Sequence, residues 1–203
     1  MTIDITDKGK NNRIEIHKSV ERSGNLRIEI LGNNNRLRIG PKTRLAAGLI
    51  EIRNHESEMT IGEGCVISGQ LRLRADDTRL IIGDQTTMMG AQITLHEAGT
   101  IRLGRDCMLS GNITMDVSDM HSILDAKTGT RINPPEDIEI GDHVWIAQGV
   151  QILKGARIGS NCIIGAKSLV SGDTPEGSLA AGVPARVMKS GVTWDRRRLP
   201  VEK

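Results

Sequence analysis

The chain lacks most of the residue types that build an ordinary globular core. Its 203 residues include two tryptophans, no tyrosine and no phenylalanine. Large aromatic side chains dominate the energetics of most protein cores, so their near absence argues against a wide globular interior. It fits a narrow interior filled by isoleucine, leucine, valine and small residues, as in a chain that grows by stacking repeats.

Two further shortages exclude classes of function. The first residues, MTIDITDKGK, contain no apolar segment of the signal-peptide type, and no later apolar run is long enough to span a membrane. We therefore expect a cytoplasmic protein without a membrane span. The net charge is +2 and 26% of the residues are charged, so the chain has no polybasic character and predicts no nucleic-acid partner.

Cysteine is also scarce, and its three positions follow one rule. Cys65, Cys107 and Cys162 each stand four residues after the aliphatic residue of an Ile-Gly or Leu-Gly step. A shared place in a repeat predicts compact interior residues, which is how free cysteines usually behave. We therefore expect no disulfide, no cysteine ligand and no cysteine nucleophile.

What the chain does contain is a period of six. From residue 140 to residue 173 it reads IGDHVW, IAQGVQ, ILKGAR, IGSNCI, IGAKSL, VSGD. An aliphatic residue opens each hexad: Ile140, Ile146, Ile152, Ile158, Ile164 and Val170. Helices repeat their apolar face every three to four residues and strands every two, so neither explains a period of six. Hexads are typical of a β-helix, which predicts an all-β solenoid with three short strands per coil.

The earlier part of the chain repeats more loosely and contains one interruption. Glycines follow an aliphatic pair at Gly40, Gly62, Gly83, Gly104 and Gly141, with intervals of 22, 21, 21 and 37 residues. We expect these glycines at corners that require a positive φ or a close approach of two backbones. The long interval predicts an inserted loop at about residues 118–135, SDMHSILDAKTGTRINPP, and solenoids tend to gather such insertions on their binding face.

The hexad pattern ends near residue 173, which sets the expected organisation of the chain. We predict a β-helix domain over residues 1–174 that includes the inserted loop, and a C-terminal tail over residues 175–203 that packs back on the coils. A short helix is expected within the tail, near residues 192–199.

The inserted loop contains the best candidate for acid–base chemistry. Of the five histidines, His121 lies in this loop, and a neutral imidazole there could accept a proton from a hydroxyl group. Asp119, two residues earlier, is a candidate to orient the ring. An ordinary exposed loop histidine is the alternative. Neither His121 nor His143 has two further ligands at a short spacing, so we predict no metal site.

The regular coils contain a second candidate. Trp145 takes the sixth place of its hexad, which points outward from the coil. In a chain almost free of aromatics, an outward tryptophan predicts a ligand wall, a subunit contact or a lid. Cations follow towards the C-terminal end, among them Lys154, Lys167, Arg186 and Lys189, for which a solvated surface is the alternative.

These motifs together resemble a known family. The hexads with IGAKSLVSGDTPEGSLAAGVPARVMK resemble the closing segment of the left-handed β-helix acyltransferases of the hexapeptide-repeat type. RDCMLSGNITM, SDMHSILD, GTRINP, GDHVWIAQGVQILKG and GVTWDR are similar to phrases of capsular polysaccharide O-acetyltransferases, particularly those that act on sialic-acid polymers.

The resemblance implies more than the spacing does. It implies a left-handed parallel β-helix, a homotrimer with active sites between subunits, and acetyl-CoA as the acetyl donor. It implies that His121 is the general base and that Trp145 lies against the acetyl end of the donor. The remaining donor contacts that it implies are Ala166, Lys167, Arg186 and Lys189.

The function expected on this basis is acetyl-CoA-dependent O-acetylation of a sugar hydroxyl on a capsular or other surface polysaccharide, with a sialic-acid-type polymer favoured. The nearest alternative keeps the donor and changes the acceptor to a small sugar, a nucleotide sugar or an antibiotic. More distant alternatives are a zinc enzyme similar to the γ-type carbonic anhydrases and a non-catalytic trimeric scaffold.

Overall fold

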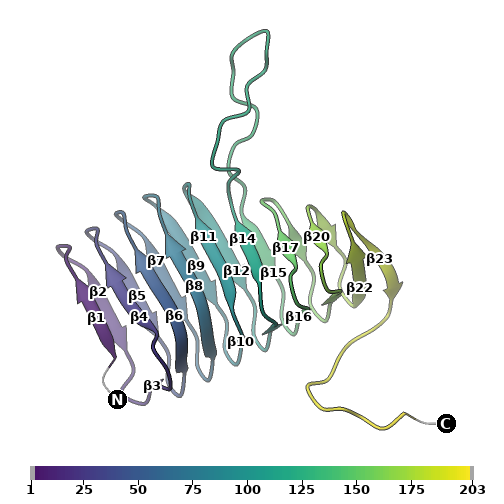
Figure 1. Ribbon diagram of the computed structural model, residues 1–203, viewed down its shortest axis with the longest axis horizontal. Helices are drawn as coiled ribbons and strands as arrows, with labels where there is room; N and C mark the ends of the chain where they lie inside the picture. Colours follow the sequence, from purple (N-terminus) through teal and green to yellow (C-terminus); the bar gives the residue numbers. More distant parts are fainter. Residues whose placement is uncertain (1–2, 202–203) are drawn as a thin grey trace.

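The computed structural model describes residues 3–201 as a solenoid of stacked coils (Figure 1). Its regular elements in this range are 23 β-strands, without a helix. All strands pair in parallel with the strand one coil away, with one exception: β23 (Ala185–Ser190) is antiparallel to β22 (Ser178–Gly182). Residues 1–2 and 202–203, the outer ends of the two predicted units, lie outside the described residues.

Each coil contributes one strand to each of three faces, and each face is named here after one of its strands. The β15 face is an eight-stranded sheet, which corresponds to about eight coils. Its members are β2 (Arg13–Ile16), β5 (Arg36–Ile39), β7 (Glu58–Ile61), β9 (Thr78–Ile82), β12 (Gly99–Leu103), β15 (Ile138–Ile140), β18 (Arg157–Ile158) and β21 (Asp173–Thr174).

The other two faces share two long strands, β6 (Arg44–Ile52) and β8 (Val66–Leu73), which bend around the corner between them. The β16 face contains β3 (Glu21–Arg22), β10 (Thr87–Met88), β13 (Met108–Leu109), β16 (Trp145–Ile146), β19 (Ile163–Ile164), β22 (Ser178–Gly182) and β23 (Ala185–Ser190). The β14 face contains β1 (Asp4–Asp7), β4 (Arg27–Ile30), β11 (Ala91–Leu95), β14 (Ile113–Asp116), β17 (Gln151–Ile152) and β20 (Leu169–Val170).

The interior is the stack of aliphatic residues that the hexads predict. The six residues that open the hexads are all at least 97% buried. Alternate residues of the earlier strands fill the prism in the same way, so the core runs the length of the solenoid. The fold class predicted from the sequence, a left-handed parallel β-helix, is confirmed.

The three cysteines belong to this interior. Cys65, Cys107 and Cys162 are fully buried and unpaired. Burial raises the pKa of each thiol, that of Cys107 to about 11. A thiol that stays protonated is a poor nucleophile, so the prediction of compact interior residues is confirmed.

The sequence suggested two reasons for glycine at the corners, a positive φ or a close approach of two backbones, and the structure shows the second. Gly83 and Gly104 stand where successive backbones almost touch: a Cβ on Gly83 would lie 2.5 Å from the carbonyl carbon of Gly104. Positive φ occurs two residues later instead, at Gln85 (60°) after Gly83 and at Asp106 (53°) after Gly104. The glycines therefore permit close approach between coils, and the left-handed turn belongs to polar residues that project from the corner.

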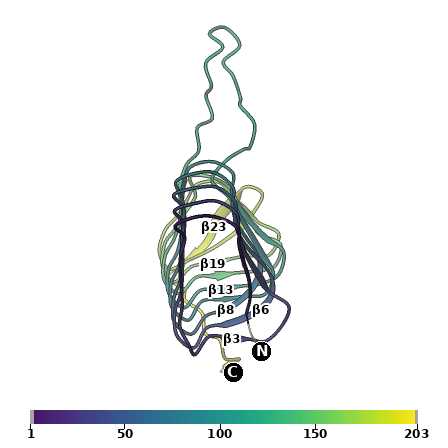
Figure 2. The same cartoon turned by 90° about the vertical axis from the view of Figure 1, so that its left-hand side faces the viewer.

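The chain departs from the coils in two places. Residues 118–135 leave the corner between β14 and β15 and project as a long loop, from the edge of the prism opposite the C-terminal tail (Figure 1). Viewed along the coils, the loop stands clear of the stacked turns (Figure 2). The helix predicted near residues 192–199 is wrong, since this segment is extended and lies along the coils through side-chain anchors.

The described part of the chain contains no helix long and apolar enough to cross a membrane.

Candidate functional site

Asn133 holds the two arms of the inserted loop together. Its side chain is 93% buried. The Oδ1 atom accepts a hydrogen bond from the N–H of Ile123 (2.7 Å), while Nδ2 donates to the Asp119 carboxylate (2.8 Å) and to the carbonyl of His121 (2.9 Å). One amide thus fixes the backbone on both sides of His121.

An ion pair fixes the base of the loop to the coil below it. The Arg131 guanidinium donates two hydrogen bonds to Glu97, at 2.7 and 2.6 Å, and the Ser118 hydroxyl donates to the same carboxylate at 2.5 Å. These contacts, those of Arg131 first, lower the pKa of Glu97 to about 2. Bidentate pairs of this kind are geometrically specific, so the loop leaves the solenoid in a defined direction.

Lys154 supplies a third attachment and overturns one hypothesis. Its Nζ lies 2.7 Å from the Asp119 carboxylate and donates to the carbonyl of Pro134 at 2.9 Å. Together with Asn133, Lys154 lowers the pKa of Asp119. The Asp119 carboxylate therefore holds the loop, and the proposal that it orients the His121 ring is wrong for the chain as described.

The imidazole of His121 is therefore open to a substrate. The residue is exposed, and no group among residues 3–201 hydrogen-bonds to its ring. Its backbone, in contrast, is held at both ends: the N–H donates to the carbonyl of Asp119 and the carbonyl accepts from Asn133. A neutral ring on a fixed backbone has a free lone pair for a proton from a substrate hydroxyl.

The loop also presents an uncovered apolar surface around this histidine. Four large side chains of the loop are more than half exposed: Met120, Ile123, Leu124 and Ile132. Exposed apolar groups that are contiguous usually mark a contact surface.

Trp145 lies outward on the β16 face, as its place in the hexad predicts. Its neighbours in register are Met108 on β13 and Ile163 on β19. The side chain is half-buried, and its Nε1 atom is buried without a hydrogen-bond partner among the described residues. Buried indole N–H groups usually find an acceptor, so this donor is left unsatisfied within the described chain.

The four remaining predicted donor contacts lie towards the C-terminal end of the same face. Ala166 and Lys167 form the exposed corner after β19, where Lys167 has a φ of 61°. Arg186 and Lys189 are exposed on β23. Trp145 is in register with Ile163, then Leu179, then Lys189. Lys189 is therefore three strand spacings from Trp145, or about 14 Å. These positions form one surface with Trp145.

His121 does not belong to that surface. Its loop rises from the corner between the β14 and β15 faces, which is the corner opposite the β16 face (Figures 1 and 2). Within one chain, the structure therefore brings Trp145 and the cationic residues together and leaves His121 on the other side of the prism.

The C-terminal tail is anchored to the coils by an aromatic contact with His143. Trp194 stacks on the His143 ring, with centroids 4.3 Å apart and an 8° angle between planes. The Nε1 of Trp194 donates to the carbonyl of His143 (2.8 Å), and the His143 Nε2 lies 2.9 Å from the carbonyl of Trp194. The Trp194 and Trp145 rings are 6.2 Å apart, so the tail forms one wall of the surface around Trp145.

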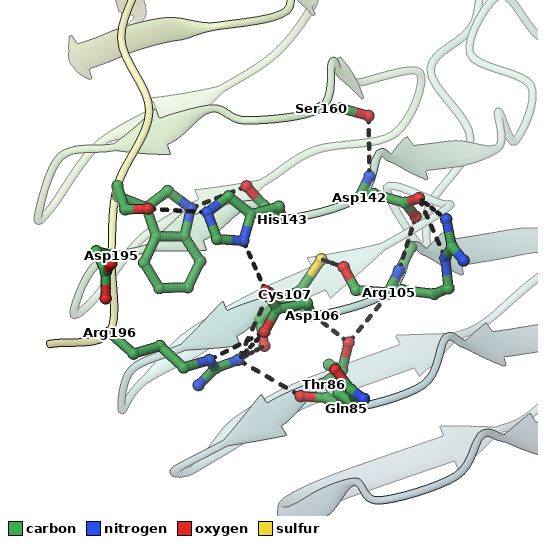
Figure 3. Close-up of polar contacts among 12 residues, drawn as sticks. Gln85, Thr86, Arg105, Asp106, Cys107, Asp142, His143, Ser160, Asp195 and Arg196 are labelled. Atoms are coloured by element: carbon green, nitrogen blue, oxygen red, sulfur yellow. Dashed lines mark hydrogen bonds and ion pairs between the residues drawn. The ribbon is translucent and has the colours of Figure 1, made fainter.

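Asp106 joins the tail to the next corner. Its carboxylate meets His143 Nδ1 at 2.7 Å and the Arg196 guanidinium at 2.9 Å (Figure 3). Burial opposes ionisation of Asp106, but the hydrogen bonds from His143 and Arg196 outweigh it and lower the pKa of this carboxyl. Both ring nitrogens of His143 face acceptors, so this histidine serves as a hydrogen-bond donor in the structure and not as a base.

No group of three or more His, Cys, Asp or Glu side chains within residues 3–201 has an arrangement that could hold a metal ion.

Comparison with known proteins shows which family has this fold and sequence. Residues 137–172 match the model of the bacterial transferase hexapeptide (six repeats). A polysialic acid O-acetyltransferase from Neisseria meningitidis is 33% identical over 150 residues, which cover 74% of this chain and 69% of that protein. The chain belongs to the hexapeptide-repeat O-acetyltransferases.

Two further members of this family show the extent of the likeness. A polysialic acid O-acetyltransferase from Escherichia coli is 31% identical over 119 residues, but these span only 39% of that longer protein. The crystal structure of the polysialic acid O-acetyltransferase OatWY superposes with a TM-score of 0.85 at 27% identity, covering 96% of this chain and 92% of that one. Family membership therefore makes the protein an acyltransferase and argues against the scaffold alternative.

Sequence reasoning missed the residues that hold the two candidates in place. Arg131 and Asn133 lie in the phrase GTRINP, which carries the resemblance, but the sequence does not show which groups they hold. Arg131 meets Glu97, and Asn133 meets Asp119, only once the chain has folded. Trp194 did carry a signal, as the second of two tryptophans in the chain. Its partner His143 was considered only as a metal ligand.

Proposed function

We propose that the protein transfers an acetyl group from acetyl-CoA to a hydroxyl of an acidic surface polysaccharide, with a sialic-acid-type polymer favoured. The observation that carries this proposal is the free imidazole of His121 on a backbone fixed by Asn133 and Lys154. The names of the polysialic acid O-acetyltransferases similar to this chain support the acceptor class.

His121 is the general base of the proposed reaction. Its ring accepts the proton of the sugar hydroxyl as that oxygen bonds to the acetyl carbon. Acetyl-CoA would supply an activated thioester, whose carbon–sulfur bond breaks in the same direct transfer. The imidazolium then returns its proton to the departing thiolate, so that His121 ends each turnover neutral. A general base of this kind contributes about 10²–10⁴-fold to the rate.

The surface around Trp145 is the proposed donor side. The buried, unpartnered Nε1 of Trp145 suits the carbonyl oxygen of the acetyl group, on which negative charge develops during the attack. Lys189, about 14 Å along the same row, and Arg186 are exposed cations that suit the phosphates of the donor. Ala166 and Lys167 would meet the arm between these two ends.

A homotrimer completes the proposed site. One chain places His121 and Trp145 on opposite sides of the prism, so they meet only if the loop of one copy reaches the β16 face of another. The exposed Met120, Ile123, Leu124 and Ile132 supply the apolar surface for such a contact. The cytoplasmic location expected from the sequence stays a prediction.

An acceptor panel tests this function. Thiol release from acetyl-CoA is measured with polysialic acid, a neutral polysaccharide, single sugars and chloramphenicol, and the product is examined for an alkali-labile ester. We expect release and ester formation with the acidic polymer. Release with a single sugar or chloramphenicol alone would show that the acceptor is a small molecule, and no release with any acceptor would contradict the proposal.

A further inference from the structure

A hollow of about 620 Å³ lies at the corner between the β14 and β16 faces, in the N-terminal half of the solenoid. Three arginines line it: Arg22, Arg27 and Arg72. Two side-chain amides, of Asn25 and Gln70, complete its polar wall, and no carboxylate is among its lining residues. This hollow is called the arginine groove below.

A glycine keeps the floor of the arginine groove open. Gly48 has a φ of +125°, and a Cβ at this position would lie 1.7 Å from the carbonyl oxygen of Gly69 in the next coil. The tight stacking of these two glycines, at the bend of β6 and β8, therefore excludes any side chain from the floor. The groove is shaped by the backbone as well as by its polar wall.

Two of the three arginines of the groove, Arg27 and Arg72, are only weakly neutralised. The Nε of Arg72 is buried without a hydrogen-bond partner among the described residues, and its Nη2 contacts the side-chain oxygen of Gln70. Arg27 is largely exposed and lies 4.0 Å from Glu29. Glu51 is in register beside Arg72, but its carboxylate is already paired with Arg53 (3.3 Å) and Arg74 (3.0 Å). The groove keeps a surplus of positive charge.

The arginine groove is continuous with the loop that contains His121. One outward row of the β14 face runs in register through β4, β6, β8, β11 and β14, and its members are Arg27, Leu49, Gln70, Gln92 and Thr114. The row covers four strand spacings, or about 19 Å. It ends in a smaller hollow of about 180 Å³, whose lining includes Thr114, Asp119 and Lys154 at the base of the loop.

We propose that this row and the arginine groove form the track along which the acceptor polymer lies, and that the track recognises carboxylate groups on successive sugars. The inference deepens the proposed function and depends on it for the identity of the reaction. Glutamine and threonine side chains suit sugar hydroxyls, and the planar arginine guanidinium suits carboxylates. Because the proposed donor surface begins at β16, five strand spacings from β3 or about 24 Å along the solenoid, the charges of the groove are not needed for the phosphates of acetyl-CoA.

Matched substitutions test the track. Arg27→Gln and Arg72→Gln each remove one positive charge from the groove. Arg79→Gln removes the same charge from β9 on the β15 face, where Arg79 is exposed and has no ion pair within the described range. Equilibrium binding is measured with polysialic acid and with the same polymer after its carboxyl groups are reduced to alcohols, at fixed salt concentration.

We expect the wild type to prefer the native polymer and each groove variant to lose about fivefold in affinity, which is the usual size of an exposed charge contact. The double variant should lose about 25-fold, and Arg79→Gln should match the wild type. In kinetics, KM for the polymer should rise in the groove variants, whereas KM for acetyl-CoA and kcat with a short oligosaccharide should not change.

Three results would overturn the track. The first is an equal loss of affinity in Arg79→Gln, which would mean that the polymer responds to the total charge of the protein and not to arginines in the groove. The second is equal binding of the carboxyl-reduced polymer, or tighter binding of a single-stranded nucleic acid. The third is a rise in KM for acetyl-CoA, which would assign the groove to the donor. If the polymer binds as expected but receives no acetyl group, the proposed function fails while the binding track stands.

Discussion

The two segments that leave the solenoid are held in opposite ways, and each contains a histidine. The loop at residues 118–135 is attached by charged and amide side chains at its base, and the His121 ring remains free. The tail at residues 191–201 is attached by an aromatic stack, and both ring nitrogens of His143 are occupied.

The two attachments show which histidine ring is open to a substrate. A ring stacked on Trp194 between a carboxylate and a carbonyl oxygen is a structural pin, since each of its nitrogens faces an acceptor. A ring that points into solvent from a fixed backbone has a nitrogen that can accept a proton. In the proposed mechanism the two segments therefore have different tasks: the loop would present the general base, and the tail forms a wall beside Trp145.

The largest expected effect comes from exchanging the two histidines for alanine, one at a time. His121→Ala should lower kcat by about 10²–10⁴-fold without changing the thermal unfolding temperature, because the ring is exposed and makes no hydrogen bond or ion pair within the described chain. His143→Ala should lower kcat less than tenfold and should loosen the tail. Steady-state thiol release and thermal unfolding of both variants check this, and a larger loss of kcat in His143→Ala would reverse the assignment.

A smaller loss of activity is expected when the loop is loosened without touching His121. Asn133→Ala removes the amide that joins both arms of the loop, and a misplacement of about 1 Å costs up to about 10²-fold in rate. We expect kcat to fall about 10–10²-fold. Thr128→Ala is the matched control, because its hydroxyl bonds only within the tip of the loop, where it donates to Asp125 and accepts from the N–H of Thr130. An unchanged kcat in Asn133→Ala would contradict the positioning role of this residue.

The tail gives a spectroscopic test of the same comparison. Trp194→Ala should release the tail and expose Trp145, which is then the only tryptophan in a chain without tyrosine or phenylalanine. Its fluorescence emission should shift to longer wavelength, and hydrogen exchange should rise in residues 191–201 alone. Trp194→Phe, which keeps a ring against His143, should shift the emission less. Equal spectra for the two variants would mean that Trp194 does not shield Trp145.

The smallest expected effect is a loosening of the loop in acid. Hydrogen bonds lower the pKa of Glu97 from about 4.5 to about 2 in the folded chain. A lowered carboxyl pKa stabilises the folded arrangement above the unfolded pKa, and this contribution is lost as the pH falls through about 4.5 to 2. The protection of residues 118–135 against hydrogen exchange, relative to the intrinsic exchange rate at each pH, should therefore fall over this range, and Glu97→Gln should show the lower protection already at neutral pH.

Much of this structure could be predicted because the solenoid repeats. The hexads that Ile140 opens predicted the outward Trp145, and the spacing of the Ile-Gly and Leu-Gly steps predicted the buried cysteines and the place of the inserted loop. The attachments could not be predicted in the same way. Asn133 with Asp119, and Trp194 with His143, are pairs separated by 14 and 51 residues, and no period in the sequence connects them.

The proposed active site needs two copies of the chain, because one chain keeps His121 and Trp145 apart. His121→Ala and Trp145→Ala should each be inactive when expressed alone. When the two variants are expressed together with different affinity tags and the mixed assemblies are purified through both tags, thiol release should return, since some interfaces then pair an intact His121 with an intact Trp145. Mixed assemblies that form but release no thiol would contradict an active site shared between copies.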